Sequence, residues 1–122
     1  MACPECGTMD LNYTLEDREN IRIVHISGTV SSLNSRELGL LVDDITQKSN
    51  IIIDMAKAGV VTSSGINALM EVSVSAKNRG KRVLLLNMRP ELVKTIEQLD
   101  LYEYFIFIQS FEEGKMKLRF YT

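Results

Sequence analysis

The sequence contains little cysteine or histidine, the residues most often used for disulfides, zinc sites and acid–base catalysis. Its 122 residues include 2 cysteines and 1 histidine. Cys3 and Cys6 both precede the first predicted strand, so they cannot cross-link the body of the fold, and a tetrahedral zinc site would need two more ligands. We interpret residues 1–10 as a flexible N-terminal tail, with a metal site shared by two copies or a redox pair as alternatives. No metal ligand is therefore assigned.

Long apolar runs are also missing. The longest, such as Val83–Leu86, are far shorter than the roughly 20 residues that span a bilayer. The N-terminus has no basic segment followed by an apolar one. We therefore expect a cytoplasmic protein without direct membrane insertion. The formal net charge is -2, which gives no surface suited to polyanions, so nucleic acid is not an expected partner.

Motifs for catalysis are absent as well. The sequence has no G-x-S-x-G elbow, no G-x-x-x-x-G-K-[ST] loop and no G-x-G-x-x-G turn. His25 lies within the apolar stretch Ile23–Ile26, and we interpret it as a strand residue and not as a catalytic base. The chain is predicted not to be an enzyme and to hold no cofactor.

The residues that are present predict one domain with an opening hairpin. Hydrophobic residues make up 45% and charged residues 25% of the chain, which is ordinary globular usage. Strands are predicted at Leu11–Glu16 and Ile21–Ser27, joined by a turn at Asp17–Asn20. Gly28 is predicted to end the second strand. Ser31, Ser32 and Asn34 offer N-cap side chains for a helix that should run to about Gln47, and Glu37 has capping-box spacing from Asn34.

The remaining elements follow in a strand–helix rhythm. Predicted in order are a buried strand Ile51–Ile53, a loop from Asp54, a helix Ser64–Arg79, a strand Val83–Leu86, a helix opened by Pro90 and a strand Tyr104–Ile108. Gly80 stands where a left-handed residue ends a helix. Strands that alternate with helices pair in parallel through right-handed crossovers. The fold class is therefore α/β, a mixed β-sheet packed with α-helices.

The end of the chain is predicted to be extended. Ser110 and Glu113 have capping-box spacing, but Gly114 is expected to limit any helix there. From Lys115 apolar and basic residues alternate, which favours a strand. Its apolar residues would add an edge strand or cover a second copy of the chain, giving a possible homodimer. They are Met116, Leu118 and Phe120.

The connection from Asp54 to Ile66 ends in three consecutive hydroxyl residues at the start of a predicted helix. A helix N-terminus exposes unpaired N–H groups and the positive end of the helix dipole, so the fold would tolerate a phosphate on a serine there. Simple N-capping by Ser63 or Ser64 is the alternative interpretation.

Several separated segments together resemble a STAS domain of the anti-sigma factor antagonist type. They are residues 51–69, the turn at Gly28 and residues 80–86, and residues 87–92 and 99–105 add further similarity. The resemblance covers about Leu11 to Glu113, and we assign residues 11–122 to one STAS domain. In that family a loop reading Asp-Ser-Ser-Gly or Asp-Ser-Thr-Gly precedes an apolar helix. Here residues 62–65 read Thr-Ser-Ser-Gly, so Ser63 falls on the family's phosphorylated serine.

Two departures from the family pattern affect the predicted partner-binding face. Thr62 replaces the usual acidic residue before the serine, and residues 29–31 follow Gly28 where members often carry an acidic residue. An aspartate could orient the serine hydroxyl or help to place a kinase's metal ion, whereas Thr62 offers only a hydroxyl. The predicted consequence is a phosphorylation that is slower, altered in site or lost.

The resemblance implies a cycle of partner binding. The unphosphorylated protein would bind an anti-sigma factor that is also a serine kinase, phosphorylation at Ser63 would end that binding, and a serine phosphatase would reset it. The alternative is a scaffold subunit of a signalling or membrane lipid-transport complex, in which the loop docks without phosphate. The predicted partner-binding residues are Gly28, Ser31, Ser32, Asn34, Thr62, Ser63, Ser64 and Gly65.

Overall fold

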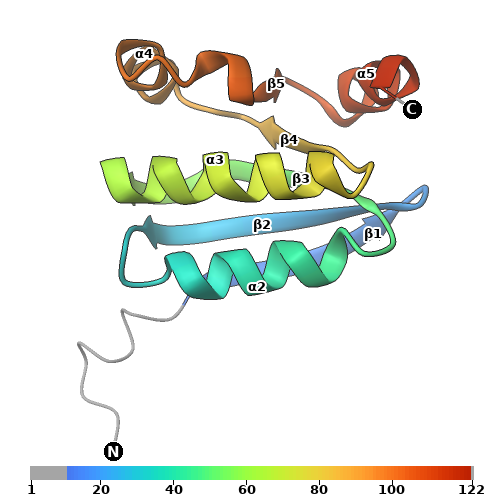
Figure 1. The fold of residues 1–122 in the computed structure, drawn as a ribbon, viewed down its shortest axis with the longest axis horizontal. Helices are drawn as coiled ribbons and strands as arrows, with labels where there is room; N and C mark the ends of the chain where they lie inside the picture. The colour runs from blue at the N-terminus through green and yellow to red at the C-terminus, as the bar shows by residue number, and fades with distance from the viewer. Residues whose placement is uncertain (1–10, 122) are drawn as a thin grey trace, which may run out of the picture.

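A five-stranded mixed sheet organises the computed structural model, which describes residues 11–121 (Figure 1). The strand order is β1-β2-β3-β4-β5; β1 is antiparallel to β2 and the other neighbours are parallel. This confirms the predicted mixed α/β fold. The strands are β1 (Asn12–Arg18), β2 (Ile21–Val30), β3 (Asn50–Val61), β4 (Val83–Leu86) and β5 (Ile106–Ile108). The helices are α2 (Ser35–Ile45), α3 (Ser63–Asn78), α4 (Pro90–Gln98), η1 (Tyr102–Tyr104) and α5 (Phe111–Tyr121).

The opening hairpin forms as predicted, with a tighter turn. β1 pairs with β2 from Asn12↔Ser27 to Arg18↔Ile21. The two residues between the strands, Glu19 and Asn20, have φ of 50° and 69°. Two consecutive left-handed residues are typical of the type I′ turn, whose twist matches that of a two-stranded ribbon.

The sheet has apolar side chains on both faces, because alternate residues of a strand point in opposite directions. Val24 and Ile26 of β2 belong to the larger core, which α2, α3 and α4 cover. Ile21 and Ile23 belong to a smaller cluster on the opposite face, where Phe111 and Leu118 of α5 pack. Burial on both faces explains the continuous apolar run of β3, Ile51–Ile53.

The predicted extended segment at the C-terminus is wrong: residues 111–121 form α5. Phe111, Gly114 and Leu118 are buried at helical spacing, whereas Met116 and Phe120 are exposed. Gly114 does not limit the helix but lets it pack closely on the sheet, because a Cβ at that position would lie only 2.9 Å from Ile108 Cδ1. The capping prediction is confirmed in part, since Ser110 Oγ accepts from Glu113 N–H.

The helical conformation of residues 111–121 leaves fewer apolar residues for the predicted homodimer contact. Leu118 is buried in its own domain, so of the three apolar residues expected to cover a second copy only Met116 and Phe120 remain at the surface. Homodimerisation stays a prediction.

The two central strands are longer than predicted. β2 continues past Gly28 to Val30, and β3 continues past Asp54 to Val61 where a loop was expected. Their pairing slips twice: His25↔Asp54 is followed by Ser27↔Lys57, and Gly28↔Ala58 by Val30↔Val61. At each slip β3 has one residue more than β2, which is the definition of a β-bulge. Gly28, with φ of 90°, supplies the left-handed backbone that β2 needs beside these bulges.

Elsewhere the element boundaries shift only slightly. α3 starts one residue before the predicted Ser64 and is followed by the left-handed Gly80, with φ of 78°. Pro90 opens α4 as predicted. The predicted strand Tyr104–Ile108 is divided between η1 and the short β5.

Candidate functional site

The predicted site lies at the end of the sheet where β2 and β3 finish and α2 and α3 begin, at the left in Figure 1. Val30 and Val61 are paired as the last residues of the two strands. The Val30 carbonyl also accepts a 3.0 Å hydrogen bond from Thr62 N–H. The loop after β2 and the first turn of α3 are thereby fixed next to each other.

Thr62 is the N-cap of α3. Its Oγ1 accepts a 3.1 Å hydrogen bond from Gly65 N–H, and its backbone is extended with φ of −78° and ψ of 169°. The alternative interpretation that Ser63 or Ser64 caps the helix is therefore wrong. Both serines occupy the first turn of the helix itself and are exposed. Their hydroxyl groups are available to solvent and to a partner.

Gly65 allows the close approach of α3 to the end of β2. A Cβ built on Gly65 would lie 2.3 Å from the Val30 carbonyl oxygen, a distance that real atoms do not adopt. Gly65 itself is buried. Its place in the sequence motif is therefore explained by packing, since any side chain would push the serine-bearing turn away from β2.

The loop between β2 and α2 is held by Asn34. Its Oδ1 accepts from Ser31 N–H at 3.0 Å, and its Nδ2 donates to the Thr29 carbonyl at 2.7 Å. Asn34 is only 2% exposed. The predicted capping box is wrong, because Asn34 makes no side-chain cap to α2 and Glu37 instead accepts from Leu11 N–H.

The predicted partner-binding residues therefore divide by exposure. Ser31 and Asn34 are buried, and Ser31 Oγ accepts from Leu33 N–H within its own loop. Gly28 lies inside β2, two positions before its end. Ser32, Ser63 and Ser64 are exposed.

Sequence analysis did not assign two exposed apolar residues at this end of the sheet. Leu33 is 62% exposed in the loop before α2, and Val60 is 64% exposed near the end of β3. The sequence did not indicate that they lie at the surface, because apolar residues are usually assigned to the core. Single exposed apolar residues are common, but here they share an edge with the exposed serines.

The electrostatics of the first turn of α3 suit an anion. This turn contains no acidic residue. The N–H groups at the start of a helix have no intrahelical partner, and Thr62 satisfies that of Gly65. The N–H groups of the first turn and the helix dipole favour negative charge at Ser63 and Ser64.

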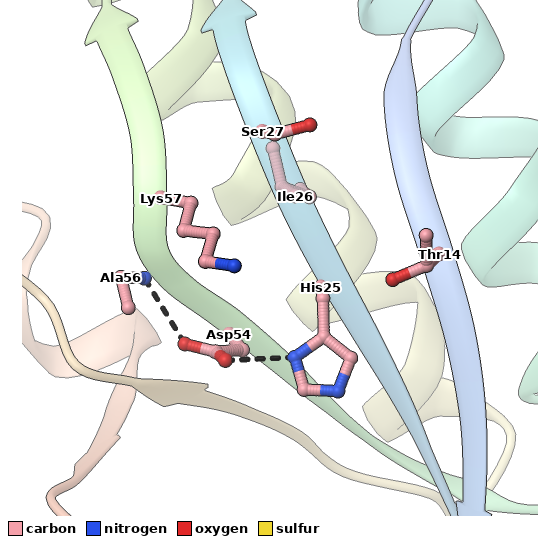
Figure 2. Close-up of a pocket in the computed structure, with 7 residues that line it drawn as sticks. All are labelled: Thr14, His25, Ile26, Ser27, Asp54, Ala56 and Lys57. Carbon is pink, nitrogen blue, oxygen red and sulfur yellow. Dashed lines mark hydrogen bonds and ion pairs between the residues drawn. The ribbon is translucent and has the colours of Figure 1, made fainter.

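A second polar cluster lies farther back along the strands, on the sheet face that carries α5, because His25 lies two residues after Ile23. Figure 2 shows its His25 and Asp54, which a dashed line joins. His25 Nδ1 is 2.8 Å from Asp54 Oδ2, and His25 Nε2 is 2.8 Å from Glu16 Oε1. Asp54 Oδ1 also accepts from Ala56 N–H at 3.0 Å and from Asn87 Nδ2 at 3.1 Å. The prediction that His25 is a strand residue is confirmed, but its carboxylate partners were not foreseen because they depend on strand register.

Hydrogen bonds within this cluster shift the pKa values of His25 and Asp54. The hydrogen bond to Glu16 raises the pKa of His25, burial opposes that rise, and Asp54 adds to it. Burial alone would raise the pKa of Asp54, but hydrogen bonds from Ala56 N–H, His25 and Asn87 together lower it. The cluster is thus an ion-paired bridge across β1, β2 and β3.

A hollow of about 390 Å³ adjoins this bridge. Asp54 places a carboxylate and Lys57 an ammonium group in its lining, so the lining does not carry charge of one sign. Both nitrogens of His25 are within hydrogen-bond distance of carboxylates, which leaves neither ready to act as a base. The hollow is lined by Thr14, His25, Ile26, Ser27, Asp54, Ala56 and Lys57.

Within residues 11–121, no group of three or more His, Cys, Asp and Glu side chains is placed to hold a metal ion. Cys3 and Cys6 lie outside the described residues. Over the same part of the chain, no helix is long and apolar enough to cross a bilayer.

Fold and site define a small α/β domain that presents exposed hydroxyl groups at a helix N-terminus, beside the end of a mixed sheet. The model of the STAS domain family matches residues 12–114. The chain therefore belongs to the STAS domain family.

Solved structures with this fold include several antagonists of anti-sigma factors. An anti-sigma factor antagonist from Mycobacterium paratuberculosis is 15% identical with a TM-score of 0.74, over 98% of this chain and 99% of that one. The antagonist SpoIIAA in its unphosphorylated form is 14% identical with a TM-score of 0.65, over 87% and 96%. The phosphorylated form of Bacillus SpoIIAA is 16% identical with a TM-score of 0.64, over 88% and 99%.

The same fold occurs as part of a larger protein. The mouse anion transporter Slc26a9 is 17% identical with a TM-score of 0.70, over 85% of this chain but 18% of the transporter. These identities are low, so the likenesses establish the fold alone.

Proposed function

We propose that this protein is an anti-sigma factor antagonist that binds an anti-sigma factor serine kinase and is released when Ser63 is phosphorylated. The observation that carries the proposal is the position of Ser63: an exposed hydroxyl in the first turn of α3, next to the N-cap Thr62. The protein acts by binding and not by catalysis. A serine phosphatase resets the cycle, which takes place in the cytoplasm.

The domain accepts a phosphate at Ser63 without unfolding. The group would sit at a helix N-terminus with no acidic residue in the first turn. Since the capping hydrogen bond belongs to Thr62, modification of Ser63 leaves that bond in place. The switch therefore changes the surface while it preserves the fold.

The same phosphate is costly once a partner covers this edge. It adds about -1.5 to -2 charges. A misplaced charge in a desolvated interface costs several kcal/mol, and about 1.4 kcal/mol changes an affinity tenfold. The proposed contact surface consists of Ser32, Leu33, Val60, Ser63 and Ser64, and the residues Gly28, Ser31, Asn34, Thr62 and Gly65 hold it in shape.

Thr62 can replace the family's acidic residue as the N-cap of the helix. Asp and Thr are both good N-cap residues, and Thr62 Oγ1 caps α3. Thr62 provides no carboxylate to orient the Ser63 hydroxyl, so phosphorylation should be slower than in a Thr62→Asp variant with the same cap.

The test is capture of partners from a lysate of the native organism with wild-type, Ser63→Ala and Ser63→Glu proteins. A histidine-kinase-like ATPase should bind the first two and be lost with the third. Asn78→Glu is the matched control, because it places the same charge at the exposed opposite end of α3, outside the proposed contact surface. Because glutamate imitates phosphate imperfectly, a protein carrying genuine phosphoserine at position 63 is included.

A STAS scaffold subunit is the second candidate. It is favoured by the similarity to part of the mouse transporter Slc26a9, in which the matched region covers 18% of the chain. A scaffold would retain the same partners with the wild-type, Ser63→Ala, Ser63→Glu and phosphoserine proteins. That result would replace the proposed switch.

A further inference from the structure

The strand that leads to Ser63 has an unusual edge. β3 pairs with β4 only from Ile51 to Asp54, where β4 ends at Leu86. β3 then continues to Val61 with β2 on one side. On the other side the chain turns away at Asn87, which has φ of 62°, and enters α4. Among residues 11–121, which the structure describes, no strand therefore pairs with the distal half of β3 at this edge.

Side chains take the place of the missing strand at both bulges. At the first bulge, Asp54 Oδ1 accepts from Ala56 N–H. At the second, Arg89 donates from Nη1 to the Ala58 carbonyl at 2.7 Å and from Nη2 to the Gly59 carbonyl at 2.5 Å. Consecutive carbonyls of a regular strand point in opposite directions. Arg89 binds both of them, which is possible only while the bulge is present.

The second bulge determines how Ser63 is presented. It lies between Ala58 and Val61, immediately before Thr62. Bulges redirect the strand that follows them and are frequent beside functional sites. If this bulge were lost, every later residue of β3 would move by one position relative to β2. The first turn of α3, which follows β3 directly, would move with them.

We propose that Arg89 is a positioning residue for Ser63. Its planar guanidinium fixes the second bulge of β3 and thereby holds the edge that carries Val60 and Ser63. This inference rests on the proposed function in naming Ser63 as the regulated residue. A lysine cannot replace the fork, because its ammonium is a compact charge without a planar pair of donors.

The structural arm of the test is amide hydrogen exchange of the free full-length protein. In Arg89→Ala, residues 57–63 should exchange at least about tenfold faster than in the wild type, while residues 51–53 keep their protection. Arg79→Ala is the matched control: Arg79 bonds Asp43 and Thr46 Oγ1, and its side chain is 29% exposed against 38% for Arg89. Its exchange at residues 57–63 should equal that of the wild type.

Two outcomes would overturn the assignment. Exchange at residues 57–63 could be unchanged in Arg89→Ala, or it could rise equally throughout the chain. If Arg89→Ala does not fold, Arg89→Lys decides the matter, with an intermediate and still local acceleration expected. Wild-type exchange in Arg89→Lys would then contradict the role.

The functional arm uses the kinase captured by the wild-type protein. Its affinity for Arg89→Ala should fall by about tenfold or more at a temperature where both arginine variants are fully folded, and that for Arg79→Ala should not change. An unchanged affinity for Arg89→Ala would overturn the positioning role. If the wild type binds no kinase, the proposed function fails, while the exchange experiment still decides whether Arg89 holds the bulge.

Discussion

At the scale of single residues, polar side chains hold the backbone near the site while the serines stay exposed. Thr62 caps α3, Asn34 braces the loop before α2, and Arg89 binds the second bulge of β3. Each uses hydrogen bonds to the backbone, which satisfies groups that regular secondary structure leaves unpaired. The result is a rigid support for hydroxyl groups that are not themselves needed for folding.

Gly65→Ala should lower the free energy of unfolding by about 1–3 kcal/mol, because the new Cβ overlaps the Val30 carbonyl and forces α3 away from β2. Gly39→Ala is the control, since nothing lies within 4 Å of its Cβ in α2. That variant should be stabilised by about 0.5–1 kcal/mol. Urea denaturation measures both, and equal effects in the two variants would contradict the packing account.

His25 predicts a dependence of stability on pH. Folding raises its pKa, so its contribution is fully present below the unfolded value of 6.5 and is lost as the pH rises through the folded value. We therefore expect the difference in the free energy of unfolding between the wild type and His25→Gln to decline above a pH of about 6.5. The decline should be below about 1 kcal/mol, because the cluster is partly exposed. A pH-independent difference would contradict the bridge.

At the scale of elements, the pattern of the sequence predicted most of the strands and helices but not the C-terminal helix. Residues 115–120 alternate apolar and basic residues as a strand does, yet they form α5. The buried positions are Phe111, Gly114 and Leu118, a helical spacing that the alternation obscured. The apolar face of the sheet around Ile52 supplies the surface that selects the helix.

The buried and exposed sides of α5 give a matched pair of substitutions. Leu118→Ala should lower the free energy of unfolding by about 2–3 kcal/mol, since Leu118 is 6% exposed. Phe120→Ala should change it by less than about 0.5 kcal/mol, since Phe120 is 82% exposed. Were the segment a strand, both residues would lie on one face, and the two variants would behave alike in thermal and urea unfolding.

The distal half of β3 shows why the site could be predicted only in part. The motif from Thr62 to Gly65 located the first turn of α3 correctly. The two bulges depend on register with β2, and the His25–Asp54 contact depends on the same register. Pairing between distant strands cannot be read from local spacing, so the extension of β3 to Val61 and the hydrogen bonds of Arg89 to β3 emerged only from the structure.

At the scale of the whole molecule, the site and α5 lie at opposite ends of the sheet (Figure 1). α5 covers the second core cluster, whereas the ends of β2 and β3 present the serines with Leu33 and Val60. A partner can therefore bind the serine edge without displacing a helix of the domain. This separation is what a binding module needs if phosphorylation is to control association and not folding.

The most direct test is the affinity of the captured kinase for the full-length protein with and without phosphate on Ser63, measured by titration calorimetry. Phosphorylation at Ser63 should weaken binding by more than about 100-fold, while the melting temperature of the free protein changes little. Phosphoserine placed at position 78, exposed at the opposite end of α3, provides the comparison for charge alone. Equal affinities for the unmodified and Ser63-phosphorylated proteins would contradict the switch.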